Sequence, residues 1–137
     1  MQRTLAIVKP DGVADGRIGD VLSRIEREGF RIVALRLMRL SRAEAEGFYA
    51  VHRQRPFFAD LTAFMSSGPC VVLVLEGENA IARWREAMGA TDPQKAAEGS
   101  LRKRFGASVE RNLVHGSDAP DTAAAEISYF FGNIELS

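Results

Sequence analysis

Histidine is scarce in this chain of 137 residues, and one of its two copies, His115, lies in the segment NLVHGSD, residues 112–118. An apolar pair precedes it and small polar residues follow it, so it stands at the end of a short predicted strand. Glu126 lies on the helix predicted to come next. A carboxylate that accepts a hydrogen bond from one ring nitrogen fixes the tautomer and makes the other nitrogen more nucleophilic. His115 is therefore a candidate nucleophile, and the alternative is a packed histidine that bonds Glu126 for structural reasons alone.

Three cationic positions could bind an anion near such a nucleophile. Lys9 directly ends the first apolar run, Arg85 shares a helical face with apolar residues, and Arg102 begins a basic run of three residues. Each also has an ordinary explanation. Lysines at strand ends and basic runs are commonly solvated, and an arginine beside apolar residues can extend its charge to water. The residue types alone leave both explanations open.

Two of the aromatic residues between the second and third predicted strands, and the second histidine, are further candidates. Tyr49 is expected in the last turn of a helix, where a tyrosine usually packs at the edge of the core, and His52 is expected to be a solvated residue beyond it. Phe57 begins the next predicted helix and is either a core aromatic or an exposed platform on which a base could stack. The pattern alone favours core packing for both aromatic residues.

Composition and absent motifs argue against several classes of function. The formal net charge is zero, so bulk charge predicts neither a nucleic-acid nor a membrane partner. No glycine-rich P-loop motif and no paired Cys or His spacing of a zinc site occurs. The single cysteine, Cys70, lies in an apolar run, so a buried thiol and a reducing compartment are expected. Because no segment has the length of a transmembrane helix or a signal-peptide core, we expect a cytoplasmic protein.

The elements that must position these residues follow from hydrophobic periodicity and turn chemistry. Ser41 and Glu44 form a capping box at the start of one helix. From residue 90 to about 111 the pattern is lost, apart from one short helix near Leu101, and long irregular segments of this kind are usually functional. The predicted strands are 5–8, 31–40, 70–75 and 113–115. The predicted helices are 18–28, 41–50, 57–65, 78–88 and about 123–131.

This order of elements predicts a single α/β domain over residues 1–137. We expect a ferredoxin-like α/β sandwich, with a four-stranded antiparallel sheet and helices packed on it. The strands are too few, and the glycines wrongly spaced, for a dinucleotide-binding sheet. Residues 10–12 are expected to form a turn, Ser117 and Asp118 to cap the last helix, and Gly116 to leave room for a ligand beside the histidine ring.

In their order along the chain, these segments resemble the nucleoside diphosphate kinase family, of the short bacterial kind, over nearly the full length. The similarity is carried by RTLAIVKPDGV (3–13), FYAVH (48–52), RPFF (55–58), SGP (67–69), LEGENA (75–80), MGATDP (88–93) and NLVHGSD (112–118). The last motif, with KPDGV upstream, is highly specific. The resemblance implies an enzyme that transfers the γ-phosphoryl of a nucleoside triphosphate to a nucleoside diphosphate, by a ping-pong mechanism and with low base specificity.

The resemblance also assigns a role to each matching position. His115 matches the histidine that is phosphorylated, and Ser117 and Glu126 match the residues that orient it. Phe57 matches the aromatic residue that stacks on the base, with Val109 expected nearby. The residues that match those holding the triphosphate and the sugar are Lys9, Tyr49, Arg85, Thr91, Arg102 and Asn112. Of these, Lys9 and Tyr49 are also expected to be catalytic.

Cofactor and partners follow from the same resemblance. Family members use Mg²⁺ bound mainly through the nucleotide phosphates, so no metal ligand is expected among the side chains, and they form tetramers or hexamers built from dimers. No membrane and no specific nucleic acid is expected as a partner. Lys103-Arg104 makes the loop more basic than is usual in the family, which bears on subunit contacts rather than catalysis. The rival interpretations are a non-enzymatic regulatory or nucleic-acid-binding module and a relative that has lost catalysis.

Overall fold

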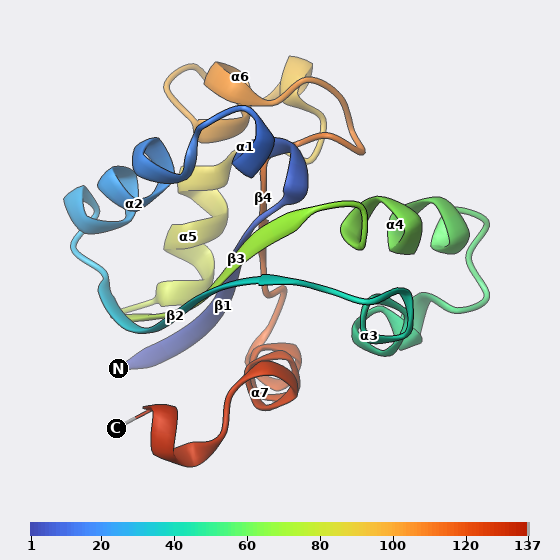
Figure 1. Ribbon diagram of the computed structural model, residues 1–137. Helices are drawn as coiled ribbons and strands as arrows, with labels where there is room; N and C mark the ends of the chain where they lie inside the picture. Colours follow the sequence, from blue (N-terminus) through green and yellow to red (C-terminus); the bar gives the residue numbers. More distant parts are fainter. Residues whose placement is uncertain (137) are drawn as a thin grey trace.

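The computed structural model describes residues 1–136, in which four strands form one antiparallel sheet of order β2-β3-β1-β4 (Figure 1). The strands are β1 (Gln2–Val8), β2 (Arg31–Arg39), β3 (Pro69–Gly77) and β4 (Val114–Gly116). β1 and β3 lie in the middle and are buried over most of their length, whereas β2 and the short β4 form the edges. This order is that of a ferredoxin-like sheet, as the sequence predicts.

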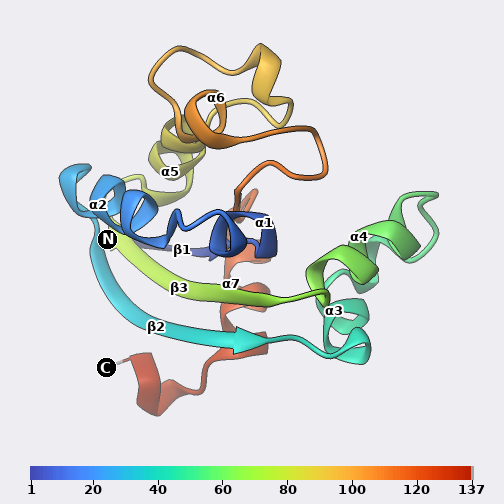
Figure 2. The ribbon, with the colours of Figure 1, turned by 45° about the horizontal axis from the view of Figure 1, so that its top comes forward.

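Helices cover both faces of the sheet. They are α1 (Pro10–Ala14), α2 (Ile18–Arg27), α3 (Arg42–Phe48), α4 (Phe58–Met65), α5 (Ala80–Met88), α6 (Leu101–Phe105) and α7 (Pro120–Phe130), with short 3-10 turns at Ala50–His52, Pro93–Lys95 and Asn133–Leu136. Figures 1 and 2 show α2, α5 and α6 on one side of the sheet and α7 on the other, with α3 and α4 projecting as a pair at one end. None of these helices is long and apolar enough to cross a membrane.

Alternation along the central strands sends their side chains to two separate cores. Ala6 and Val8 pack with Trp84 of α5 on one face, and Leu5 and Ile7 pack with the residues of α3, α4 and α7 on the other. The central strands are therefore shielded from solvent on both faces of the sheet, which explains the continuous apolar run of β3. Cys70 is buried in the second core as expected, and burial raises the pKa of its thiol to about 11.

Two local expectations of the sequence hold in detail. The capping box of α3 is present, because Ser41 Oγ accepts a bond from the Glu44 backbone at 3.0 Å and the Glu44 carboxylate accepts one from the Ser41 backbone at 2.8 Å. The short helix expected near Leu101 is α6. Both begin at a serine whose hydroxyl accepts a backbone N–H three residues later, which is the local signal that makes helix starts predictable.

Other local expectations are wrong. Residues 10–12 do not form a simple turn but open α1, because Pro10 occupies the first helical position, where its missing N–H costs nothing. Phe57 is the N-cap of α4 rather than its first residue. Ser117 and Asp118 do not cap α7, whose N-cap is Ala119. The side chains of Ser117 and Asp118 are engaged elsewhere, as described below.

A strained turn precedes β4, which therefore begins one residue later than predicted. Leu113 has a φ of +78°, and Val114 N donates to Asn112 O across it at 2.9 Å, as in a γ-turn. Leu113 O accepts a bond from Lys9 N at 2.9 Å, and Leu113 N donates to Asp11 Oδ2 at 3.0 Å. These two bonds tie the turn to the start of α1 and hold a conformation that a leucine rarely adopts.

Gly116 at the end of β4 is required by a close approach of α5. A Cβ atom there would lie 2.6 Å from Trp84 Cδ1 and 2.7 Å from Met88 Cε. Trp84 also donates from Nε1 to the His115 carbonyl at 3.2 Å. The missing side chain thus allows two core residues to approach β4, while Gly116 itself lines the cavity described below. The expectation that it leaves room for a ligand beside the ring stays a prediction.

Candidate active site

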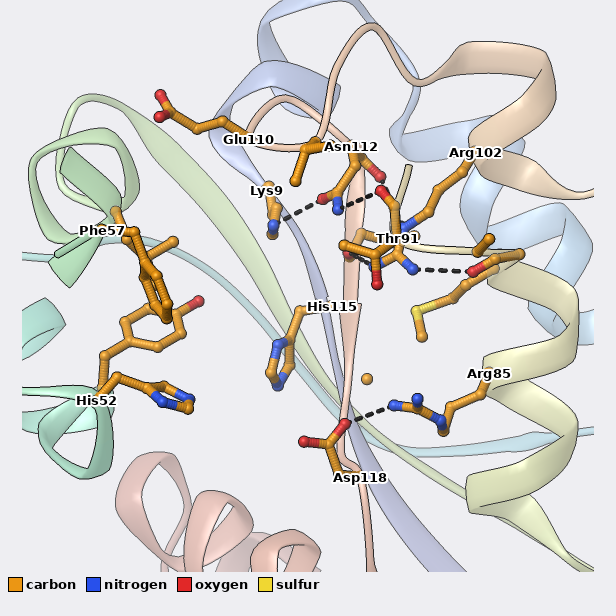
Figure 3. Close-up of a pocket in the computed structure, with 18 residues that line it drawn as sticks. Lys9, His52, Phe57, Arg85, Thr91, Arg102, Glu110, Asn112, His115 and Asp118 are labelled. Atoms are coloured by element: carbon orange, nitrogen blue, oxygen red, sulfur yellow. Dashed lines mark hydrogen bonds and ion pairs between the residues drawn. The ribbon is translucent and has the colours of Figure 1, made fainter. Parts of the chain in front are cut away.

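The predicted site residues come from distant parts of the chain and line one cavity of about 670 Å³ (Figure 3). The α3–α4 pair bounds one side of it, and α5 with the segment 89–112 bounds the other. Ser117 and Glu126 do not line the cavity but lie behind the histidine. The predicted residues in the wall are Lys9, Tyr49, Phe57, Arg85, Thr91, Arg102, Val109, Asn112 and His115.

His115 is held in position through only one of its two ring nitrogens. Its Nε2 lies 3.0 Å from Glu126 Oε1, and the same oxygen accepts a bond from Ser117 Oγ at 2.8 Å. Ser117 Oγ in turn accepts the backbone N–H of Leu5 at 3.1 Å, so the carboxylate is fixed to the central strand. The edge of the ring packs against Phe48, with centroids 5.5 Å apart. The expected bond between His115 and Glu126 is confirmed, and Nδ1 has no partner among residues 1–136.

Lys9 is buried, although the ordinary expectation for a lysine at a strand end is solvation. Its Nζ donates to Asn112 Oδ1 at 2.7 Å, and Asn112 Nδ2 donates to the Thr91 carbonyl at 3.1 Å. Burial, and then the charge of Arg102, lower the pKa of Lys9 to about 8. The charges of Asp11 and Glu110 raise this pKa but do not offset the lowering, and the one hydrogen-bond partner of the ammonium is neutral. This part of the cavity is therefore suited to an anion.

Arg102 is buried as well, so the solvated-charge explanation is wrong for it. Its guanidinium donates to three backbone carbonyls, those of Val114 at 2.8 Å, Gly89 at 2.9 Å and Asn112 at 3.2 Å. Burial, followed by repulsion from Arg85, lowers its pKa to about 10. Arg102 therefore joins the long loop to β4 and also brings positive charge to the cavity wall.

Arg85 is paired with a neighbouring carboxylate of the cavity wall. Its Nη1 donates to Asp118 Oδ1 at 2.5 Å, and the two side chains remain 49% and 77% exposed (Figure 3). An exposed pair of this kind contributes about 0–1 kcal/mol, so a bound anion can compete for the arginine. The choice that the sequence left open for Arg85 is resolved in favour of an ion pair.

The other end of the cavity is apolar and open. Phe57 is 47% exposed and Val109 is 57% exposed, and both line the wall. The His52 ring lies beside Phe57, with centroids 5.6 Å apart. Tyr49 is buried, with its ring centroid 6.5 Å from that of His115, and burial raises the pKa of its hydroxyl. The core alternative is therefore wrong for Phe57, whose ring faces the cavity as a stacking platform would.

Three titratable residues of the wall are absent from the set predicted from the sequence. They are His52, Glu110 and Asp118. His52 and Asp118 belong to the motifs FYAVH and NLVHGSD, which is the signal that could have found them. Glu110 follows Val109 directly but belongs to none of the quoted motifs.

The cavity joins a histidine held by a carboxylate to buried cations and an exposed aromatic ring, and the family comparison agrees with this combination. The profile of the family described as Nucleoside diphosphate kinase matches residues 2–136. The chain belongs to the nucleoside diphosphate kinase family.

Individual nucleoside diphosphate kinases resemble the chain over almost all of its length. The nucleoside diphosphate kinase of Desulfosudis oleivorans is 62% identical over 136 residues, which cover 99% of this chain and 98% of the relative. The solved structure of the Aquifex aeolicus enzyme superposes with a TM-score of 0.97 at 47% identity, covering 99% of each chain. The Halobacterium salinarum enzyme, solved in complex with CDP, has a TM-score of 0.95 at 43% identity and covers 99% of this chain and 91% of the other.

Nucleoside diphosphate kinase activity is thus the function of this chain, a phosphotransferase of nucleotide metabolism. The interpretation as a non-enzymatic module on a ferredoxin-like fold is excluded. The expected family and the expected fold are both confirmed.

Proposed function

We propose that the kinase works through a phosphohistidine at His115, in two half-reactions that share one cavity. The observation that carries the proposal is the asymmetric environment of the ring, in which Glu126 occupies Nε2 and leaves Nδ1 without a partner among residues 1–136. A nucleoside triphosphate would phosphorylate Nδ1, leave as the diphosphate, and be replaced by a second nucleoside diphosphate that removes the phosphoryl group.

The first half-reaction balances without an additional base. The Nδ1 lone pair forms the N–P bond while the bond between the γ-phosphorus and the bridging oxygen breaks, and its electrons remain on the departing diphosphate. The proton on Nε2 stays there, in its hydrogen bond to Glu126, whose negative charge offsets the positive charge that the ring acquires. Ser117 keeps that carboxylate in place.

The cations supply the stabilisation that such a reaction needs. Phosphoryl transfer passes through a loose transition state with charge spread over the peripheral oxygens, so positioning and electrostatics dominate. Lys9, Arg85 and Arg102 surround the cavity and would neutralise this charge. Tyr49 and Thr91 lie in the same wall and would contribute hydroxyl groups.

The apolar end is proposed to hold the nucleoside. The base would stack on Phe57 with Val109 on its other side, and the sugar would lie near Lys9 and Asn112. Stacking on an aromatic ring tolerates every base, because each base has a π-face. This arrangement supports low base specificity.

Mg²⁺ is proposed to arrive on the nucleotide. Among residues 1–136, no group of three His, Cys, Asp or Glu side chains is placed to hold a metal ion. Magnesium prefers oxygen ligands and keeps several waters, so phosphate oxygens suit it better than this wall, where Asp118 is already paired with Arg85. When bound, the ion would neutralise part of the phosphate charge.

We also propose one cytoplasmic domain over residues 1–137 that assembles into a tetramer or hexamer built from dimers. The support is the outer edge of β2, which pairs with no strand among residues 1–136 and exposes Leu35 by 48% and Leu37 by 61%. An apolar, unpaired edge strand favours pairing with another chain. The mass of the particle in solution tests this part of the proposal.

The phosphohistidine is tested by labelling. Incubation with γ-labelled ATP and Mg²⁺ should leave an acid-labile, base-stable phosphate on the wild-type chain and none on His115→Ala. The matched control is His52→Ala, which removes the other histidine of the chain and should keep the label. A label that persists in His115→Ala refutes the mechanism, and formation of GTP from GDP and ATP separates the active enzyme from a relative that has lost catalysis.

A further inference from the structure

Glu110 is a free carboxylate in a cavity otherwise supplied with cations. It lines the wall and is exposed, and it makes no hydrogen bond or ion pair with any of residues 1–136. The other carboxylate of the wall, Asp118, is paired with Arg85. A carboxylate left without a partner beside a proposed nucleotide site has acceptor capacity that a ligand can use.

The position of Glu110 determines which part of a bound nucleotide its carboxylate can contact. Glu110 follows Val109 on the loop between α6 and β4, at the apolar end of the cavity. In the view of Figure 3 its carboxylate is turned to the side on which Phe57 lies, whereas Arg85 lies at the opposite end. A phosphate would be repelled by this charge, so the groups that suit it are the N–H and O–H donors of a nucleoside.

We propose that Glu110 is a specificity-determining residue, which accepts hydrogen bonds from N–H groups of the base and biases the kinase toward guanine nucleotides. The inference rests on the proposed function, in which the base lies between Phe57 and Val109. Guanine carries two neighbouring donors, N1–H and the exocyclic 2-amino group, which match the two oxygens of one carboxylate. Adenine and cytosine present an amino group beside an acceptor, and uracil and thymine present one ring N–H.

The bias is modest because Glu110 is exposed and water competes for it. We expect kcat/KM for GDP to exceed that for IDP, which lacks the 2-amino group, by about fivefold, the factor that corresponds to a hydrogen bond worth about 1 kcal/mol. A preference of this size is superimposed on stacking and leaves all nucleotides as substrates.

The decisive measurement is the ratio of kcat/KM for GDP and IDP in the wild-type chain and in Glu110→Ala. The Glu110 charge also raises the pKa of Lys9 and repels the phosphates, but both effects are common to GDP and IDP and cancel in the ratio. The ratio should fall from about five to about one in Glu110→Ala. The matched control is Glu98→Ala, which removes an exposed glutamate that precedes α6 and lies outside the cavity, and it should leave the ratio unchanged.

Two results would overturn the inference. One is a ratio for GDP and IDP that is the same in the wild-type chain and in Glu110→Ala. The other is a change confined to the ratio for GDP and dGDP, which would assign the carboxylate to the ribose hydroxyl. Neither result bears on the phosphohistidine at His115. The proposed function itself is refuted if the wild-type chain takes up no phosphate label and turns over no nucleoside diphosphate.

Discussion

Proton uptake on nucleotide binding is a direct consequence of the buried Lys9. In the ligand-free cavity the pKa of Lys9 is about 8, because burial and the charge of Arg102 disfavour the ammonium. A bound nucleoside diphosphate brings negative charge to this wall and favours the ammonium again. Binding therefore raises the pKa, and above about pH 7 the complex holds more protons than the free enzyme.

The size of the uptake follows from the two pKa values. A return of Lys9 from about 8 to its ordinary value of 10.5 predicts an uptake of about 0.1 proton per site at pH 7, about 0.5 at pH 8 and about 0.9 at pH 9. Arg102, whose pKa is about 10, adds at most about 0.1 at pH 9. Cys70 and Tyr49 have pKa values raised by burial and keep their protons in this range.

The assay is calorimetric titration of the unphosphorylated enzyme with a nucleoside diphosphate in two buffers of different ionisation enthalpy. Without a triphosphate no phosphoryl transfer accompanies binding, so the difference between buffers counts protons alone. Lys9→Arg keeps the charge but does not titrate below pH 10, and it should reduce the uptake at pH 9 to about 0.1. Lys95→Arg, at an exposed lysine outside the cavity, is the matched control and should keep the full uptake.

The reasoning is refuted by an uptake that stays below about 0.2 at both pH 8 and pH 9, since a buried lysine of lowered pKa must regain its proton when an anion binds. If the full proton uptake persists in Lys9→Arg, the group that takes up the proton is not Lys9, and the reasoning is refuted equally.

Three further substitutions test separate parts of the structure. Arg102→Ala should slow phosphoryl transfer by a factor on the order of 10² or more. It should also lower the melting temperature, because three backbone carbonyls lose their hydrogen-bond donor. A transfer rate within about twofold of the wild-type rate shows that Arg102 is not part of the active site. Thr4→Val should raise the free energy of unfolding, measured by urea denaturation, by about 1 kcal/mol, because the buried Thr4 hydroxyl has no hydrogen-bond partner among residues 1–136; an unchanged or lower value contradicts this account. Leu37→Lys should lower the mass of the particle in solution through the outer edge of β2, and an unchanged mass excludes that edge as the subunit contact.

The sheet and its helices are predictable because their signals are local. The continuous apolar run of β3 and the capping box at Ser41 each depend on neighbouring residues, so a single sequence contains them. The bond between His115 and Glu126 is predictable for the same reason, since a strand end and the following helix meet across a short connection.

The remaining features depend on contacts between residues far apart in the chain. Leu113 adopts its strained conformation because Lys9 and Asp11, about a hundred positions away, bond to its backbone. Arg102 looks like part of a solvated basic run, and only the folded loop places three carbonyls around it. No periodicity or motif encodes such bonds, because their partners are backbone atoms that every residue carries.

The position of β1 has a consequence for synthesis of the chain on the ribosome. β1 is the first strand to emerge, yet one of its two neighbours, β4, is the last strand of the sheet to be made. Until residue 116 leaves the exit tunnel, Ala6 to Val8 have no partner on that side, and β1 is a temporary edge strand with an apolar sequence. Such an edge is open to unwanted pairing between nascent chains. This apolar edge of β1 is therefore covered only when β4, the last strand of the sheet, has been synthesised.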